Sequence, residues 1–263
     1  MTASGEAKVP AAVVAQATGQ PLRLVWQNEL GGLTFAVGYG SSRRFVKWLP
    51  RFTPLDLSRE AVRLNWAAQY TAVPLPIDQG VDEDGSWLVT NALPGDNAVS
   101  DRWRANPAAA VTAIGRGLRN LHDVLPVSTC PFSASVEDRL ADARRRAARG
   151  GIDRAAWNPE HRHLGLDQAL ELLADPPPID RLVVCHGDAC APNTLIGEDG
   201  ECSGHVDLGQ LGVADRWADI AIATWSTTWN YGPGWQDLLL DAYGIAPDLE
   251  RTAYYRLLWD LGP

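Results

Sequence analysis

Short apolar runs separated by turn residues dominate the first hundred residues of the chain. Runs of this length, rich in β-branched and aromatic residues, predict strands rather than helices. One longer segment, 57–69, has apolar residues at helical spacing and a candidate N-cap in Ser58, so it predicts a helix. Residues 1–20 are small and polar, and we expect them to fray. The expected strands are 22–27, 34–38, 44–48 and 87–92, with a glycine-containing turn at 28–33 between the first two.

Helical patterns take over from about residue 107, where alanine-rich segments favour helix formation. A strand at 181–185, a polar loop and a hairpin around 197–200 interrupt them. The change of composition near Pro94 predicts two domains, residues 1–93 and residues 94–263. The expected helices are 108–125, 136–149, 164–174, 214–228, 235–243 and 249–258.

The bulk composition narrows the classes of protein that fit. The 263 residues are 46% apolar and 21% charged, which is ordinary for a soluble globular chain. The net charge of −9 argues against a nucleic-acid partner but is compatible with a cationic small substrate. The four cysteines form no CxxC pair, so neither a zinc site nor a redox motif is indicated. No apolar run suggests a signal peptide or a membrane span, and we expect a cytoplasmic protein that is a monomer or weak dimer.

The residues with the clearest chemistry lie at the ends of two strands predicted in the second half, the first of which is apolar. Asp188 comes shortly after the strand at 181–185, Asn193 follows five residues later, and Asp207 ends the next strand. Phosphoryl transfer uses one carboxylate to orient the attacking hydroxyl and accept its proton. It uses an Asn oxygen and a second carboxylate to hold Mg²⁺. The Asp-x4-Asn spacing equals that of the protein-kinase catalytic loop, and Asp207-Leu208-Gly209 stands where kinases have D-F-G.

The first half contains residues that could bind a nucleotide. Lys47 lies within an apolar strand, as the phosphate-binding lysine of kinases does, and Glu60 on the following helix is its natural ion-pair partner. Taken singly, each could be an exposed charge, but both precede the catalytic segment in the right order. The turn with Gly31-Gly32 could cover phosphates or be an ordinary hairpin turn. The backbone carbonyl of Asn91 and the backbone amide of Leu93 lie where an interlobe strand would bind a purine base.

These segments together resemble the aminoglycoside O-phosphotransferases of the 3′ and 3″ group, from about residue 22 to the end. The similar segments are Leu-Ser-Arg-Glu-Ala (57–61), Trp-Leu-Val-Thr (87–90), Thr-Cys-Pro-Phe (129–132), Val-Val-Cys-His-Gly-Asp-Ala-Cys-x-Pro-Asn (183–193), Val-Asp-Leu-Gly-x-Leu-Gly-Val-Ala-Asp-Arg (206–216), Ala-Asp-Ile-Ala (218–221), Ala-Tyr-Gly-Ile (242–245) and Tyr-Tyr-Arg-Leu-Leu (254–258). The resemblance implies an α+β, protein-kinase-like two-lobed fold, with a small β-rich lobe carrying one key helix and a larger helical lobe. It also implies a nucleoside triphosphate (ATP or GTP), Mg²⁺, and an aminoglycoside hydroxyl as acceptor.

The resemblance assigns roles to individual positions. Asp188 matches the catalytic base, Asn193 and Asp207 the magnesium ligands, and Lys47 with Glu60 the nucleotide-anchoring ion pair. Three further positions match residues for which we expect supporting roles. They are His186, beside the catalytic loop, and Asp215 and Asp219.

The acceptor side departs from the pattern of the kanamycin-type enzymes. Those enzymes end with an acidic pair followed by two aromatic residues, and here only Asp260 remains of that acidic pair. Glu160 matches an acidic residue that, in the resemblance, faces the drug's amines. Gln210 and Trp225 stand where arginines usually do. Each charge-assisted contact to an ammonium group contributes about 1.5–3 kcal/mol. A thinner acidic lining therefore predicts weaker or narrower binding of aminoglycosides, or another acceptor.

Three functions remain open from the sequence. The first is an aminoglycoside kinase that confers antibiotic resistance. The second is a kinase of the same fold that acts on another hydroxylated metabolite. The third, a non-catalytic kinase-like binding protein, would fit a chain lacking Asp188, Asn193 or Asp207, and all three are present.

Overall fold

The computed structural model describes residues 9–28 and 30–262 of the chain, which fall into two compact units. The first unit contains the described residues up to Gln69 together with Val73–Leu93. The second contains Tyr70–Ala72 and the chain from Pro94 onward. Each unit has its own sheet or sheets and its own helices, and each is described by itself below.

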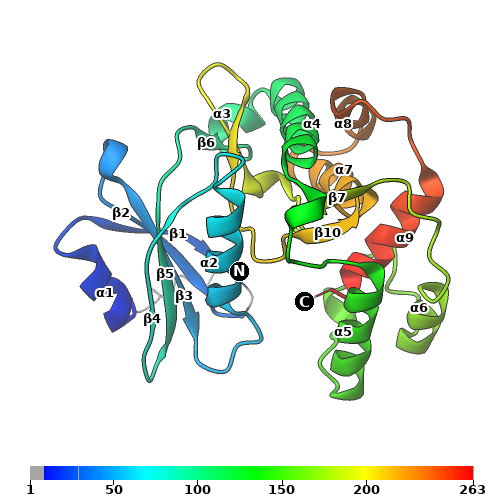
Figure 1. Cartoon of the computed structure of the whole chain (residues 1–263), viewed down its shortest axis with the longest axis horizontal. Helices are drawn as coiled ribbons and strands as arrows, with labels where there is room; N and C mark the ends of the chain where they lie inside the picture. Colours follow the sequence, from blue (N-terminus) through cyan, green and yellow to red (C-terminus); the bar gives the residue numbers. More distant parts are fainter. Residues whose placement is uncertain (1–8, 29, 263) are drawn as a thin grey trace. The chain divides into compact units, whose positions relative to one another are not determined.

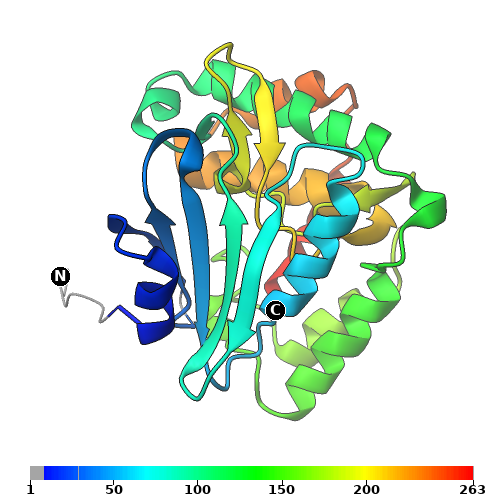
Figure 2. The same ribbon diagram turned by 60° about the vertical axis from the view of Figure 1, so that its left-hand side comes forward.

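The first unit is an antiparallel five-stranded sheet in the order β1-β2-β3-β5-β4. Helices α1 and α2 lie against its opposite faces (Figures 1 and 2). The strands β1, β2, β3 and β5 were predicted from the sequence. The bounds are α1 Ala11–Ala17, β1 Leu22–Gln27, β2 Leu33–Val37, β3 Arg44–Pro50, α2 Leu57–Ala67, β4 Pro76–Val81 and β5 Gly85–Asn91.

Two elements of this unit were not predicted. Residues 11–17, expected to fray, form α1, whose Val13 and Ala17 are buried against Phe35, Val46 and Val89 of the sheet. Apolar contact with the sheet stabilises this short helix, which would be marginal by itself. Strand β4 begins at a proline and is mostly exposed, so it lacks the apolar alternation of a half-buried strand. Both features are typical of an edge strand.

The strand register places Lys47 on the face of the sheet opposite the α1 core. Lys47 pairs with Thr34 of β2 and with Leu88 of β5, and directly opposed residues of antiparallel strands share a face. Its neighbour Val46 points to the other face, into the core beneath α1. Glu60, in the first turn of α2, reaches Lys47. The side chain of Asp56, not Ser58 as predicted, caps α2 by accepting from the backbone N–H of Ser58.

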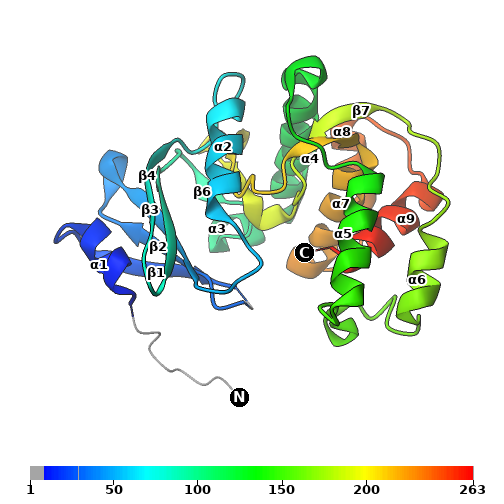
Figure 3. The ribbon, with the colours of Figure 1, turned by 60° about the horizontal axis from the view of Figure 1, so that its bottom comes forward.

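The second unit is mainly helical, with α7 packed between α4, α8 and α9 (Figure 3). Helix α7 is buried nearly all round from Trp217 to Thr227, as expected for a central helix. Two small antiparallel sheets, β10-β7 and β6-β8-β9, lie beside these helices. The bounds are β6 Asp96–Asn97, α3 Asp101–Arg104, α4 Pro107–Val124, α5 Val136–Ala148, α6 Leu166–Leu172, β7 Leu182–Cys185, β8 Thr194–Ile196, β9 Cys202–His205, β10 Gly212–Asp215, α7 Trp217–Tyr231, α8 Gln236–Tyr243 and α9 Leu249–Asp260.

The predicted starting point of the helix at residue 214 was wrong. Residues 212–215 form β10, which pairs antiparallel with β7, and α7 begins only at Trp217. The side chain of Asp215 accepts from the backbone N–H of Trp217 and so marks the turn into the helix. The helical periodicity of 214–228 could not show this, because pairing with a strand some thirty residues away is a tertiary event.

No helix within residues 9–28 and 30–262 combines the length and the apolar composition needed to cross a bilayer.

Candidate active site

The catalytic loop begins where β7 ends. Val183, Val184 and Cys185 are buried, so the strand fixes the position from which residues 186–193 leave the sheet. Gly187 adopts φ +86°, and a Cβ there would come within 2.3 Å of the carbonyl oxygen of Gln210. Both the left-handed backbone and the close approach of a second chain segment require glycine at this position.

Asp219, in the first turn of α7, holds this loop from beneath. Its carboxylate accepts from the backbone N–H groups of His186 (2.6 Å) and Gly187 (2.9 Å), and it pairs with His122 Nε2 at 2.9 Å. The Asp219 and His122 side chains are fully buried. Burial by itself raises the pKa of Asp219, but the hydrogen bond and charge of His122 outweigh it, and the pKa lies below its ordinary value. The carboxylate is therefore a permanent anchor for the residues that precede Asp188.

His186 connects the catalytic loop to the segment that carries Asp207. Its Nδ1 accepts from the backbone N–H of Asp188 at 3.2 Å, and its Nε2 lies 3.0 Å from the carbonyl oxygen of Val206. An acceptor role at Nδ1 and a donor role at Nε2 define a neutral imidazole with its proton on Nε2. His186 therefore positions two chain segments and has no free nitrogen for chemistry of its own.

The surroundings of Asp188 suit a proton acceptor. Its Oδ1 atom is buried and has no hydrogen-bond partner among the described residues. Burial raises the pKa of Asp188, and the negative charge of Asp207 raises it further. A more basic carboxylate is a better proton acceptor, and an unpartnered buried oxygen beside a second carboxylate suits a donor hydroxyl.

Asn193 and Asp207 meet at the open end of the β8–β9 hairpin. The backbone N–H of Val206 donates to the carbonyl oxygen of Asn193 at 3.0 Å, which places Asp207 next to Asn193. The Asn193 amide nitrogen donates to the carbonyl oxygen of Asp188 at 2.9 Å, which leaves Oδ1 as the atom able to bind a cation. Asp207 adopts φ +65°, a conformation that costs a non-glycine residue on the order of 1–3 kcal/mol. The amide oxygen of Asn193 and the carboxylate of Asp207 fit Mg²⁺, which prefers hard oxygen ligands.

In the first unit, Lys47 and Glu60 form the ion pair expected from the sequence. Lys47 Nζ lies 2.6 Å from Glu60 Oε1, and the Glu60 side chain is only 7% exposed while that of Lys47 is 24% exposed. The better-exposed lysine side chain is thus held by a buried carboxylate.

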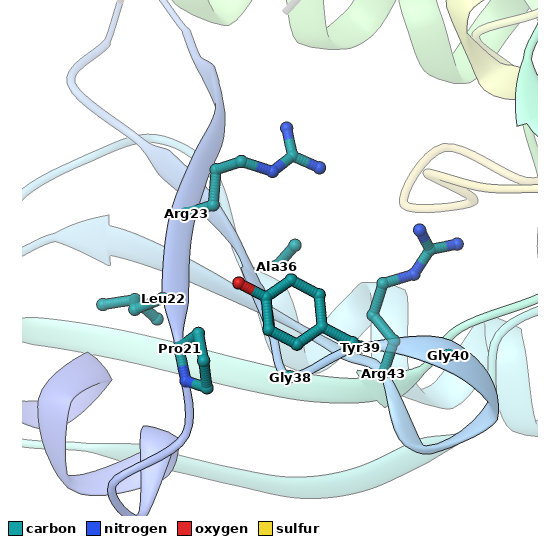
Figure 4. Close-up of a pocket in the computed structure, with 8 residues that line it drawn as sticks. All are labelled: Pro21, Leu22, Arg23, Ala36, Gly38, Tyr39, Gly40 and Arg43. Carbon is teal, nitrogen blue, oxygen red and sulfur yellow. The ribbon is translucent and has the colours of Figure 1, made fainter.

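A pocket of about 140 Å³ opens at one end of the same sheet (Figure 4). The register pairs Ala36 with Phe45, so Ala36 lies on the face that carries Lys47. The carbonyl oxygen of Arg43 accepts from the backbone N–H of Ala92, which ties the pocket wall to the segment containing Asn91 and Leu93. The lining residues are Pro21, Leu22, Arg23, Ala36, Gly38, Tyr39, Gly40 and Arg43.

The two residues expected at the acceptor site lie near one another, but one carboxylate is already engaged. Asp260 Oδ2 lies 2.6 Å from His161 Nδ1, and both Asp260 oxygens accept from the backbone N–H of Asn158. Glu160, between these two contact residues, is exposed. The Asp260 side chain is only 7% exposed, so its carboxylate mainly contacts His161 and the backbone of Asn158 rather than solvent.

Three residues of this region were not picked out from the sequence. His122 supports Asp219, His161 binds Asp260, and Ser226 Oγ accepts from the backbone N–H of Ala191 in the catalytic loop at 2.9 Å. His122 and Cys185 also approach Asp219 closely, a grouping that could in principle hold a metal. Here each is hydrogen-bonded within the protein, His122 also to the Tyr243 hydroxyl and Cys185 to a backbone carbonyl. Nothing in the local sequence distinguishes these histidines and this serine from ordinary helix or loop residues.

Comparison with known proteins defines the class. The model of the phosphotransferase enzyme family matches residues 28–255. The chain therefore belongs to this family. It is 38% identical over 219 residues to an aminoglycoside 3′-phosphotransferase from Streptomyces fradiae, covering 80% of this chain and 81% of the relative.

Solved structures agree with this assignment. The crystal structure of an aminoglycoside 3′-phosphotransferase of type VIII matches with a TM-score of 0.82 and 31% identity, over 95% of this chain and 96% of the other. The aminoglycoside phosphotransferase APH(3″)-Id from Streptomyces rimosus, in complex with ADP and streptomycin, matches with a TM-score of 0.73 and 28% identity. This match covers 95% of this chain and 96% of the Streptomyces rimosus chain. The predicted α+β, kinase-like fold is confirmed.

Proposed function

We propose that this enzyme transfers the γ-phosphate of a nucleoside triphosphate to a 3′ or 3″ hydroxyl of an aminoglycoside and so confers resistance to that antibiotic. The observation that carries the proposal is the arrangement of Asp188, Asn193 and Asp207 at the ends of β7 and the β8–β9 hairpin. The relatives support the acceptor class, since they are aminoglycoside phosphotransferases over most of this chain's length.

The reaction is a direct in-line transfer. Asp188 orients the acceptor hydroxyl and accepts its proton as the hydroxyl oxygen bonds to the γ-phosphorus. The bond from that phosphorus to the bridging oxygen breaks, and the nucleoside diphosphate leaves. Bound Mg²⁺, held by Asn193 and Asp207, would neutralise charge on the phosphates. No covalent enzyme intermediate is required, and no cysteine has a role in the transfer.

The first unit supplies the nucleotide contacts in this proposal. Lys47, held by Glu60, binds the phosphates as a point charge. The base is bound by the backbone carbonyl of Asn91 and the backbone amide of Leu93. In support, Asn91 pairs with Arg44 at the end of β3 that borders the pocket of Figure 4. Backbone recognition of this kind admits ATP or GTP.

The acceptor contacts belong to the second unit. Glu160 is exposed and is proposed to meet ammonium groups of the drug, and Asp260 contributes the part of its charge not used by His161. A kinase acting on another hydroxylated metabolite is the alternative that the thin acidic lining favours. It would show phosphoryl transfer chemistry without turnover of aminoglycosides.

Replacement of the proposed base tests the mechanism. Asp188→Ala is expected to lower kcat by about 10²–10⁴-fold, because a positioned proton acceptor contributes that much. The measurement is acceptor-dependent ADP release with kanamycin, neomycin and streptomycin in turn. The matched control is Asp175→Ala, the same substitution at an exposed aspartate, which should leave turnover unchanged. Equal rates for Asp188→Ala and the parent enzyme would exclude Asp188 as the base.

A further inference from the structure

Helix α7 places an exposed tryptophan one turn from the catalytic loop. Ser226 accepts from the backbone N–H of Ala191, and Asn230 donates to Ser226 in turn. Trp229 lies three residues after Ser226, a rise of about 4.5 Å along the helix. Its side chain is 46% exposed, although large apolar side chains on this helix are otherwise buried. Residues three apart lie on the same side of a helix, so the Trp229 side chain leaves α7 on the side from which Ser226 contacts the loop.

Trp229 is the outer member of an aromatic cluster. Its ring centroid lies 5.2 Å from that of Trp225, which is buried. On its other sides Trp225 meets His161, edge to face at 5.6 Å, and the guanidinium of Arg256 at 5.2 Å from the ring centroid. Because these contacts fill the surroundings of Trp225, Trp229 is the member of the pair that offers area to a ligand.

The same cluster already contains a cation stacked on an indole, the guanidinium of Arg256 on Trp225. Arg256 is buried and has its guanidinium over Trp225, while its N–H groups bond to neutral oxygens of Ala221, Thr224 and Gln236. A guanidinium is planar and weakly hydrated, so it stacks on an aromatic ring at small desolvation cost. An ammonium group is compact and strongly hydrated, so it loses more hydration on a ring, and a carboxylate is its better partner.

Carboxylates are scarce next to this cluster. Asp260 is bound by His161, the residue whose ring touches Trp225, and Glu160 is the adjacent exposed acid. Of the two acids beside the cluster, Asp260 is therefore engaged and Glu160 is exposed, while the Trp229 indole offers aromatic area. This combination disfavours an acceptor whose binding depends on many ammonium groups.

We infer that Trp229 is a specificity-determining residue that stacks on a planar guanidinium of the acceptor, and that it selects guanidinium-bearing aminoglycosides over polyammonium ones. This inference rests on the proposed function. It concerns which acceptor of that class is preferred and assigns no catalytic role to the indole.

The test compares kcat/KM for streptomycin, as the guanidinium-bearing probe, with kcat/KM for kanamycin, as the polyammonium probe. Trp229→Ala should lower the streptomycin-to-kanamycin ratio by about tenfold, mainly through KM for streptomycin, which is the loss expected for a partly desolvated cation–π contact. Trp229→Phe should keep the ratio within about threefold of the parent enzyme, since a ring remains. Trp229→Glu should lower it further and raise kcat/KM for kanamycin, because a carboxylate pairs with ammonium groups.

Leu172→Ala is the control, because Leu172 is an apolar side chain of similar exposure (54%) on α6. It should leave the ratio unchanged, and thermal denaturation of each variant shows whether it is folded. An unchanged ratio in folded Trp229→Ala, or an equal loss for both probes, would overturn the inference. Absence of turnover with either probe in the parent enzyme would instead contradict the proposed function.

Discussion

Histidines in the catalytic region show how burial decides what a residue can do. His205 ends β9 and is buried, with Nε2 3.6 Å from the Sγ atom of Cys202 and its ring edge to face with that of His186. Burial lowers the pKa of His205 to about 3. A histidine in this setting stays neutral and packs, so it supports the hairpin that carries Asp207 without exchanging protons.

This pKa predicts how stability depends on pH. The unfolded chain protonates His205 near the ordinary pKa of about 6.5, whereas the folded chain resists until about pH 3. Between these values the unfolded state binds more protons, so His205 makes stability fall as pH decreases, by up to about 1.4 kcal/mol per pH unit. His205→Gln should therefore be less stable at pH 8 but lose less stability between pH 7 and pH 5.

Urea denaturation at several pH values measures this difference. His163→Gln, at an exposed histidine, is the control and should keep the slope of the parent protein. Parallel pH curves for the parent and His205→Gln would show that the buried imidazole is not the source of the slope.

Helix α7 organises the catalytic loop at the scale of secondary structure. It is buried on nearly all sides, and two of its polar side chains reach that loop. Asp219 accepts from the N–H groups before Asp188, and Ser226 accepts from the N–H group of Ala191 after it. A rigid central helix therefore holds the loop on both sides of the proposed base.

Asp219→Asn tests this anchoring. An amide cannot accept with both ends, so one N–H group of the loop would face an N–H₂ donor, and His122 would lose its charged partner. Breaking a buried pair of this kind costs about 3 kcal/mol, and the displaced loop should lower kcat more than it raises KM for the nucleotide. The pKa of Asp219 is lowered, so its contribution is present at all pH values above the ordinary 3.8 and is lost only as pH falls through the lower folded value.

Chemical denaturation at pH 7 and steady-state kinetics give the two readouts. Asp241→Asn, at an exposed aspartate of α8, should change neither. A variant at Asp219 that is destabilised but keeps the parent kcat would mean that α7 stabilises the fold without positioning the loop.

At the scale of the whole molecule, each of the two units contains part of the proposed machinery. The first contains the Lys47–Glu60 pair, and the second contains Asp188 and the two proposed magnesium ligands. The chain has a net charge of −9, which repels a polyanionic nucleotide, and in the proposal a metal ion and Lys47 offset this repulsion. Binding of nucleotide should therefore depend strongly on Mg²⁺.

Thermal denaturation measures this dependence. A ligand present at a hundred times its Kd stabilises the folded state by about 2.7 kcal/mol, so ADP with Mg²⁺ should raise Tm clearly more than ADP with EDTA. In Asp207→Asn, the part of the Tm increase that depends on Mg²⁺ should disappear, and the increase that ADP gives with EDTA should remain. Asp199→Asn, in the exposed β8–β9 turn, should behave as the parent. Equal shifts with and without Mg²⁺ in the parent enzyme would contradict the assignment of Asn193 and Asp207 as metal ligands.

The sequence by itself determined most elements and the candidate residues for the chemistry. Asp188 and Asn193 follow an apolar strand, Asp207 follows the next hairpin, and Lys47 and Glu60 lie on consecutive elements, so local patterns suffice to propose them. The family resemblance that these segments carry was confirmed by comparison.

Only the tertiary structure decided which distant surfaces meet. The pairing of β10 with β7, the packing of α1, the His122–Asp219 contact across 97 residues and the His161–Asp260 contact across 99 have no local signal. Periodicity reports which side of an element is buried, but it does not report what buries it. The acceptor side depends on such long-range contacts, and for that reason its aromatic surface and its engaged carboxylate became visible only in the folded chain.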